Sequence, residues 1–148
     1  MVITVKITII EPQDGEENEI IIKCNDLSPE IMHLLNKLRT QHAIIAYIDN
    51  EIHKLDPADI YYIETVNNKT FLYGEDSVYE SRKKLYELEE MLKNNDFLRV
   101  GKSLIVNLNK LKSFAPALSG RLEAVLANGE RITISRQYVS VLKERFGI

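Results

Sequence analysis

Short runs of β-branched and aromatic residues, each followed by a turn signal, fill most of the chain after residue 43. They are AIIAYI (43–48), EIHKL (51–55), IYYIETV (60–66), FLYG (71–74), VYE (78–80), RLEAVL (121–126) and ERITI (130–134). Runs of this length and composition predict consecutive strands. The last two flank Asn128-Gly129, and both of these residues tolerate the positive φ of a tight hairpin turn. The pattern therefore predicts a mostly β fold with short helices, in the α+β class.

Three other segments carry apolar residues at helical spacing. Ser28 offers an N-cap and Pro29 a first-turn proline, which predicts a helix that ends near Thr40. A second helix is predicted over 81–92, and Ser135 is a suitable cap for a closing helix. The three apolar stripes are Ile31, Leu34, Leu35 and Leu38; Leu85, Leu88 and Leu92; and Val139, Leu142 and Phe146.

The first 43 residues have a different organisation. Isoleucine and valine alternate with polar residues from Ile3 to Ile9, and the turn segment EPQDGEEN leads into EIIIKCN. This alternation predicts a hairpin over residues 2–24. We therefore expect two parts, a strand-strand-helix extension over residues 1–43 and a domain over residues 44–148.

Composition excludes several classes of protein. The 148 residues contain no apolar run of the 18 or more that span a bilayer, and the N-terminus does not have the apolar core of a signal peptide. We expect a protein of the cytoplasm without membrane insertion. The single cysteine, Cys24, cannot form an internal disulfide, and its strand-like surroundings favour burial.

Catalytic and metal-binding patterns are missing from the sequence. His33, His42 and His53 lack the spacing of a metal site, and the only cysteine is not beside them. The chain has no Gly-rich phosphate loop, no Gly-x-Ser-x-Gly elbow and no paired cysteine motif. We therefore expect no metal, no cofactor and no enzymatic activity.

The charge is distributed unevenly along the chain. Residues 97–148 hold nine Lys and Arg against three Asp and Glu, whereas residues 1–96 hold ten against nineteen. No acidic residue lies between Asp96 and Glu123. A basic segment of this kind is typical of a protein that binds a polyanion such as nucleic acid. A basic face that only balances acidic neighbours in the same fold explains the charge equally well.

One ordered set of motifs resembles a known family. The chain from about residue 44 to 148 is similar to the LytTR-type DNA-binding domain of bacterial transcriptional regulators. It has a strand ending in Ile-Glu, then a Phe-x-Arg-x-x-x-Ser-x-x-Val-Asn block, then a Ser-Arg pair before the last helix. The matching residues of the last two motifs are Phe97, Arg99, Ser103, Val106, Asn107, Ser135 and Arg136.

This resemblance implies antiparallel β-sheets whose loops, rather than a recognition helix, enter double-stranded DNA. The family's contacting residues correspond here to Asn68 and Lys69, Lys102 and Ser103, and Arg136 and Gln137. Many members carry a histidine where this chain has Gly101, so a possible donor is lost, although Lys102 can still reach phosphate or a guanine edge. For Arg99 and Asn107 we favour a structural role, and Lys110, Lys112 and Arg121 add to the positive field.

The resemblance also bears on partners. Family members often carry a receiver domain, but residues 1–43 lack the length and the acidic pocket of one, so we expect no aspartyl phosphorylation within this chain. Instead the extension is expected to cap the domain or extend a sheet across a homodimer, with the binding of a regulatory protein as a third role. Two other functions stay open: a protein-interaction module with a basic face, and a ligand-sensing or enzymatic domain with a pocket lined by Tyr47, Tyr61 and Tyr62.

Overall fold

Two antiparallel sheets and three short α-helices make up the part of the chain that the computed structural model describes, residues 6–39 and 43–148. The helices are α1 (Pro29–Arg39), α2 (Leu85–Leu92) and α3 (Val139–Arg145). The strands are β1 (Ile44–Ile48), β2 (Glu51–Leu55), β3 (Tyr62–Val66), β4 (Lys69–Tyr73), β5 (Val78–Ser81), β6 (Phe97–Gly101), β7 (Leu104–Asn107), β8 (Leu111–Pro116), β9 (Leu122–Leu126) and β10 (Arg131–Ile134). Four 3₁₀ turns accompany them: η1 (Pro57–Asp59), η2 (Leu108–Lys110), η3 (Leu118–Gly120) and η4 (Arg136–Tyr138).

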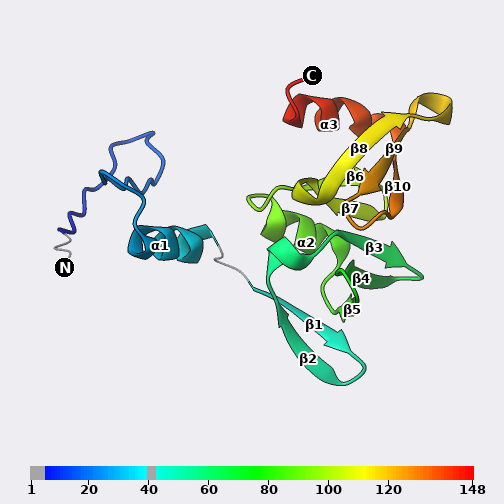
Figure 1. Cartoon of the computed structure of the whole chain (residues 1–148), viewed down its shortest axis with the longest axis horizontal. Coiled ribbons are helices and arrows are strands. Elements are labelled where there is room, and N and C mark those ends of the chain that lie inside the picture. Colours follow the sequence, from blue (N-terminus) through cyan, green and yellow to red (C-terminus); the bar gives the residue numbers. More distant parts are fainter. Residues whose placement is uncertain (1–5, 40–42) are drawn as a thin grey trace.

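The larger sheet has seven strands in the order β2-β1-β5-β4-β3-β7-β6, and the smaller has the order β10-β9-β8. The two sheets lie next to one another, with α2 beside the larger and α3 beside the smaller (Figure 1). Every strand pair is antiparallel. The predicted fold class, mostly antiparallel β with short helices, is therefore confirmed.

The larger sheet has a hydrophobic core on each face. Side chains in successive positions of a strand point to opposite faces, so Ile105 of β7 joins the core under α2, whereas Val106 joins the core beneath the smaller sheet. The predicted leucine stripe of α2 faces the first core, because Leu85, Leu88 and Leu92 are all buried there. Leu142 of α3 is buried in the second. β3, β7 and β6 thus lie between two packed layers.

The predicted helix starts agree with the structure in one case and differ in another. The N–H of Ile31 donates to Oγ of Ser28 over 3.3 Å, which confirms the N-cap of α1. Thr40, where this helix was expected to end, lies outside the described residues. Ser135 makes no side-chain capping bond, and α3 begins only at Val139 because the 3₁₀ turn η4 comes first.

The hairpin predicted for residues 2–24 is not present in the described part of that segment. A turn forms at Asp14-Gly15, where Gly15 has φ of 87°, but residues 6–24 form no strand. An isolated two-stranded hairpin is marginal in water unless a third strand or a helix covers one face. Cys24 lies in this segment and is exposed, so the expectation that it is buried was wrong.

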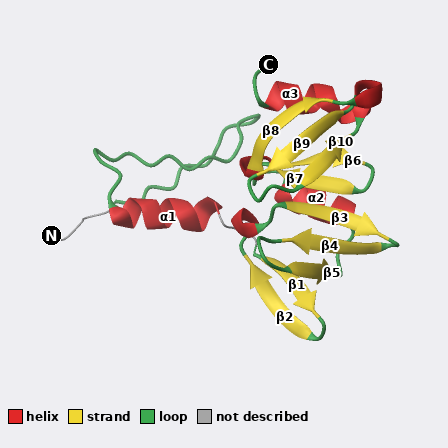
Figure 2. Ribbon diagram, turned by 45° about the vertical axis from the view of Figure 1, so that its right-hand side comes forward, coloured by secondary structure: helices red, strands yellow, loops and turns green. Residues whose placement is uncertain are grey.

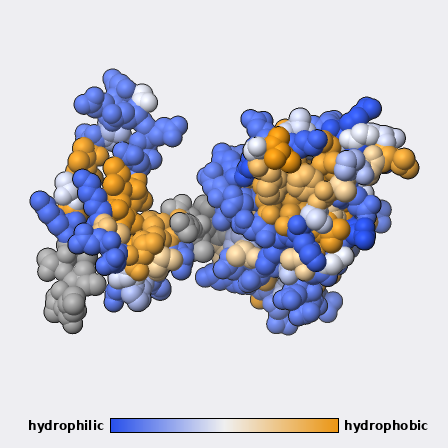
Figure 3. Space-filling view, turned by 45° about the horizontal axis from the view of Figure 1, so that its top comes forward, coloured by the Kyte–Doolittle hydropathy of each residue, from blue (hydrophilic) through white to orange (hydrophobic). Residues whose placement is uncertain are grey.

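Several apolar side chains of the extension face solvent. They are Ile7, Ile9, Ile10, Ile20, Ile21, Leu27, Met32 and Leu34, with exposed fractions between 38% and 90%. In the space-filling view they contribute to the orange area on the left-hand body (Figure 3). Contiguous exposed apolar surface is typical of an interaction site. None of the helices that the structure describes combines the length and the apolar character needed to cross a membrane.

Candidate nucleic-acid interface

The turn between β3 and β4 consists of two asparagines in the left-handed region. Asn67 has φ of 51° and Asn68 has φ of 63°, the combination that a two-residue type I′ hairpin requires and that asparagine tolerates. Figure 2 shows this turn at the right-hand end of the larger sheet. Asn68 and the adjacent Lys69, the first residue of β4, are both exposed. The turn therefore presents an amide and a cation to solvent.

The turn between β6 and β7 lies directly beside the end of β3. The N–H of Thr65 donates to the carbonyl of Ser103 over 2.9 Å. Lys102 and Ser103 are both exposed. The second pair of predicted contact residues is thus next to the first pair.

Arg99 fixes the shape of the β6–β7 turn. Its Nε donates to the carbonyl of Gly101 over 2.8 Å, and Nη2 donates to the carbonyl of Lys102. Nη1 forms an ion pair of 2.8 Å with Oε2 of Glu89 in α2. Because one planar guanidinium holds two successive turn carbonyls, the position of Lys102 depends on it. The structural role favoured for Arg99 agrees with these contacts.

The third segment follows β10 and meets the second. The N–H of Ser135 donates to the carbonyl of Val100 in β6 over 2.9 Å. The two segments pack closely, since a Cβ at Gly101 would be in van der Waals contact with Oγ of Ser135 at 3.4 Å. Arg136 and Gln137, in η4, are exposed. We call the three adjacent segments, residues 67–69, 101–103 and 135–137, the turn row.

The cations of the turn row have no carboxylate partner. Within residues 6–39 and 43–148, Lys69, Lys102 and Arg136 make no ion pair. Other basic residues of the C-terminal third are engaged elsewhere: Arg131 pairs with Glu123 over 2.7 Å, and Arg145 lies 3.7 Å from Asp96. The row thus offers positive charge that an anionic partner can neutralise.

Asn107 and Lys110 lie at the opposite end of the same strands. Nδ2 of Asn107 donates to the carbonyl of Ile60 over 2.8 Å, and Oδ1 accepts from the N–H of Asn109. This buried amide agrees with the structural role favoured for it. Nζ of Lys110 lies 4.9 Å from the ring centroid of Tyr61, near the start of β3, so this cation is remote from the turn row.

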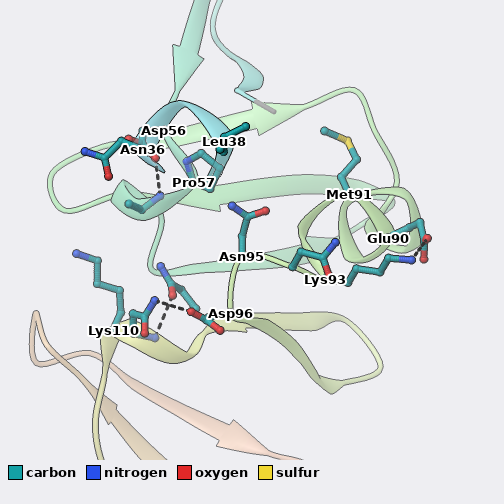
Figure 4. Close-up of a pocket in the computed structure, with 14 residues that line it drawn as sticks. Asn36, Leu38, Asp56, Pro57, Glu90, Met91, Lys93, Asn95, Asp96 and Lys110 are labelled. Atoms are coloured by element: carbon teal, nitrogen blue, oxygen red, sulfur yellow. Dashed lines mark hydrogen bonds and ion pairs between the residues drawn. The ribbon is translucent and has the colours of Figure 1, made fainter. Parts of the chain in front are cut away.

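A cavity of about 1190 Å³ lies at this opposite end, between α1, η1, α2 and η2. Figure 4 shows acidic, basic, amide and apolar side chains around it. Among its lining residues are Asp56, Glu90 and Asp96, together with Lys93 and Lys110. Nζ of Lys93 already pairs with Glu90 over 2.6 Å. Three carboxylates against two engaged cations make this cavity unsuitable for a polyanion.

The three tyrosines proposed for a ligand pocket do not share one. Tyr61 is buried beneath the smaller sheet, Tyr47 lies under the guanidinium of Arg82, and Tyr62 stacks on Tyr73 with ring centroids 4.2 Å apart. Burial raises the pKa of Tyr62, and the carboxylate of Glu130 raises it further. These contacts indicate packing roles. No group of three or more His, Cys, Asp or Glu in the described residues is arranged to hold a metal ion.

A turn that sequence reasoning did not treat as a contact lies beside Arg136. A Cβ added at Gly120 in η3 would lie 3.0 Å from Cδ and 3.1 Å from Cγ of Arg136. Ser119-Gly120-Arg121 was a visible turn signal, but its spatial neighbour depends on how the smaller sheet packs.

Taken together, the fold and the turn row define a β-rich domain that presents basic and amide side chains from loops, a class suited to nucleic acid. Residues 50–147 match the model of the LytTr DNA-binding domain. The chain therefore belongs to the LytTr DNA-binding domain family, which confirms the resemblance found in its motifs.

Solved and curated relatives agree with this assignment. A LytTr DNA-binding domain from Bacillus cereus shares the fold, with a TM-score of 0.68 and 24% identity, and the match covers 72% of this chain and 97% of that one. Two curated relatives, from Staphylococcus aureus strains NCTC 8325 and bovine RF122, are each 29% identical over 126 residues, 85% of either chain. Both are named uncharacterized HTH-type transcriptional regulators. A helix-turn-helix motif consists of two helices joined by a short turn. In the described residues of the present chain, no two α-helices are consecutive elements.

Proposed function

We propose that this protein regulates transcription by binding defined sequences of double-stranded DNA through the turn row. The main support for the proposal is that three segments far apart in the sequence meet at one end of their strands. Each segment brings an exposed cation without a carboxylate partner. Membership of a DNA-binding family and the names of the curated relatives support it. The role is binding rather than catalysis, and its target requires a location in the bacterial cytoplasm.

The side chains of the row divide into two kinds of contact. Lysines attract the phosphate backbone from any direction, which gives affinity that depends on salt but not on sequence. Arginine, asparagine and glutamine can each form two parallel hydrogen bonds with a base edge in the major groove. We therefore assign Lys69 and Lys102 mainly to phosphate, and Asn68, Arg136 and Gln137 to bases. Ser103 serves as an additional donor.

Selection of bound fragments from a random duplex library tests this function. The expected result is one enriched sequence, bound at least about a thousandfold more tightly than a scrambled duplex at physiological salt. Equal affinity for every duplex would favour the protein-interaction alternative, in which the basic face meets an acidic protein. That alternative keeps one supporting observation, the uneven distribution of charge.

We also propose that residues 1–43 are an extension separate from a domain at 44–148, and that the protein acts as a homodimer through this extension. The exposed isoleucines bury little against their own chain, and pairing with a second copy would supply the additional strands that an isolated hairpin needs. A dimer also lets two modest interfaces read two half-sites.

Light scattering on the full chain, free and on DNA, tests the dimer. We expect two chains per complete site, and we expect Ile9→Asp or Ile21→Asp to produce monomers. Ile52→Asp, on exposed β2, is the matched control and should leave the dimer intact. One wild-type chain per complete site would contradict the homodimer and favour a capping role or a regulatory protein as the partner of the extension.

A further inference from the structure

We propose that the turn from Leu118 to Arg121 is a fourth segment of the DNA interface, in which Gly120 positions Arg136 and Arg121 contacts phosphate. This inference rests on the proposed function and extends it. The turn joins β8 to β9 in the smaller sheet, whereas two segments of the turn row come from the larger sheet.

The backbone at Gly120 packs against the stem of Arg136. Gly120 has φ of 74°, and a side chain there would meet Cγ and Cδ of Arg136 at 3.1 and 3.0 Å. Real Cβ atoms rarely come so close to other atoms, so a methyl group there would force the arginine stem to shift by a few tenths of an ångström. The glycine therefore serves two needs at once: it permits the left-handed backbone, and it leaves room for the arginine stem.

The turn itself is closed by backbone hydrogen bonds. The N–H of Ala117 donates to the carbonyl of Arg121 over 2.9 Å, and the N–H of Arg121 donates to the carbonyl of Leu118 over 3.3 Å. Ser119, with φ of 61°, completes the tight path. A closed turn is a fixed surface, and it limits the rotamers that the stem of Arg136 can adopt. An arginine whose stem is held loses less conformational freedom when its guanidinium binds a base edge.

Arg121 extends the positive charge of the turn row. It is exposed, it follows Gly120 directly, and within residues 6–39 and 43–148 it forms no ion pair. The nearest acidic residue along the chain, Glu123, already pairs with Arg131 over 2.7 Å, so it is engaged elsewhere. A cation beside the base-reading arginine, on the adjoining turn, is well placed for the flanking phosphate.

Two glycines provide a matched test of the positioning role. Gly120 and Gly129 both lie in tight turns, with φ of 74° and 87°, so alanine is strained at both; no atom lies within 4 Å of a Cβ at Gly129. We expect Gly120→Ala to lower the ratio of affinities for the selected and scrambled duplexes about tenfold, and Gly129→Ala to leave it unchanged. Fluorescence anisotropy measures the ratio, and thermal melting confirms that both variants fold.

A double-mutant cycle separates positioning from general damage to the fold. If Gly120 acts through Arg136, the alanine has no further effect on the ratio in an Arg136→Ala background. A loss of equal size in both backgrounds, or equal losses for the two glycine variants, would overturn the positioning role. If wild-type protein binds no duplex, both this proposal and the proposed function fail. If Arg136→Ala lowers the ratio but Gly120→Ala does not, only this proposal fails.

Arg121→Ala tests the phosphate contact and does not depend on the folding of a glycine variant. We expect equal weakening on both duplexes and a salt slope smaller by about one, as for a single lost phosphate contact. Lys110→Ala removes the same charge from the far end of β3 and should leave the slope unchanged. Equal slopes for the two variants would show that Arg121 acts only through the net charge and would overturn its assignment.

Discussion

The N–H of Ser135 donates to the carbonyl of Val100 over 2.9 Å and thereby joins the end of the smaller sheet to an edge strand of the larger one. The two sheets also share a hydrophobic core, and this bond adds a direct link between the segments that carry Arg136 and Lys102. The bond helps to keep a fixed spacing between the arginine that we propose for base readout and the lysine that we propose for phosphate.

Replacement of Arg136 should relax specificity. Arg136→Ala is expected to cost about 1–3 kcal/mol on the selected duplex and to lower discrimination at one base position in each half-site. Lys112→Ala should weaken selected and scrambled duplexes by similar factors, because Lys112 is exposed on β8 and acts through the field. Paired titrations measure both, with circular dichroism as the check on folding. An unchanged affinity ratio for Arg136→Ala would rule out its role in base readout.

Arg99→Lys should disorder the β6–β7 turn although the charge is kept. An ammonium cannot reproduce the fork that bonds the carbonyls of Gly101 and Lys102. We expect a loss of about 1.5–3 kcal/mol in the free energy of unfolding, the range for hydrogen bonds to charged groups, and weaker binding of the selected duplex. Urea denaturation and anisotropy measure these.

Glu89→Gln is the control for Arg99. It weakens only the half-exposed ion pair and leaves both turn bonds in place, so about 0–1 kcal/mol of stability should be lost and DNA binding retained. Equal losses of DNA binding in the two variants would show that the ion pair, rather than the turn carbonyls, positions the loop.

Salt should weaken DNA binding in proportion to the phosphates contacted. With Lys69, Lys102 and Arg121 on phosphate, the plot of log K against log salt should have a slope of about −2.7 per protomer, from roughly −0.9 for each phosphate. Alanine at all three positions should flatten the plot. A wild-type slope near zero would be incompatible with binding to the DNA backbone.

Alkaline pH should destabilise the fold through Tyr62. Burial raises the pKa of Tyr62 in the folded protein, and nearby Glu130 acts in the same direction. An unfolded tyrosine loses its proton near pH 10. The unfolded chain therefore gains charge first, so this stability is fully present below about pH 10 and is lost as pH rises toward the folded pKa.

Tyr62→Phe should reduce that loss. Urea denaturation between pH 8 and pH 11 should show a shallower decline for this variant than for wild type. Tyr86→Phe, at a tyrosine that is 66% exposed on α2, is the control and should follow the wild-type profile. Parallel declines for all three proteins would mean that other groups cause the alkaline loss.

Seven of the strands after residue 43 could be predicted because short-range patterns determine them, whereas β6, β7 and β8 were not among the predicted runs. Asn128-Gly129, for example, indicated the hairpin between β9 and β10. The N-terminal alternation was equally clear but did not produce paired strands, since pairing requires a covering layer that residues 6–24 do not have in this chain alone. The alternation of apolar residues indicates which segments can form strands, but whether two strands pair depends on the structure that covers them.

The candidate site also has a part that the sequence predicted and a part that it did not. Motif resemblance identified Asn68, Lys102 and Arg136, and the fold brings them to one edge. The contact between Gly120 and Arg136 could not be predicted, because it depends on how two turns of the smaller sheet meet after its strands have packed. Nor did Ser135 act as a side-chain cap, since η4 starts the closing helix with a tighter 3₁₀ turn.

The left-handed pair Asn67-Asn68 restricts how target preference can diverge among relatives. Only Asn, Asp and Gly adopt such backbone angles at low cost, so few side chains can replace these two without opening the turn. Lys69 begins a regular strand and Lys102 has an ordinary negative φ, so both can change to almost any residue. A new target preference should therefore arise by substitution of the two lysines, while the asparagines keep the backbone shape of the turn between β3 and β4.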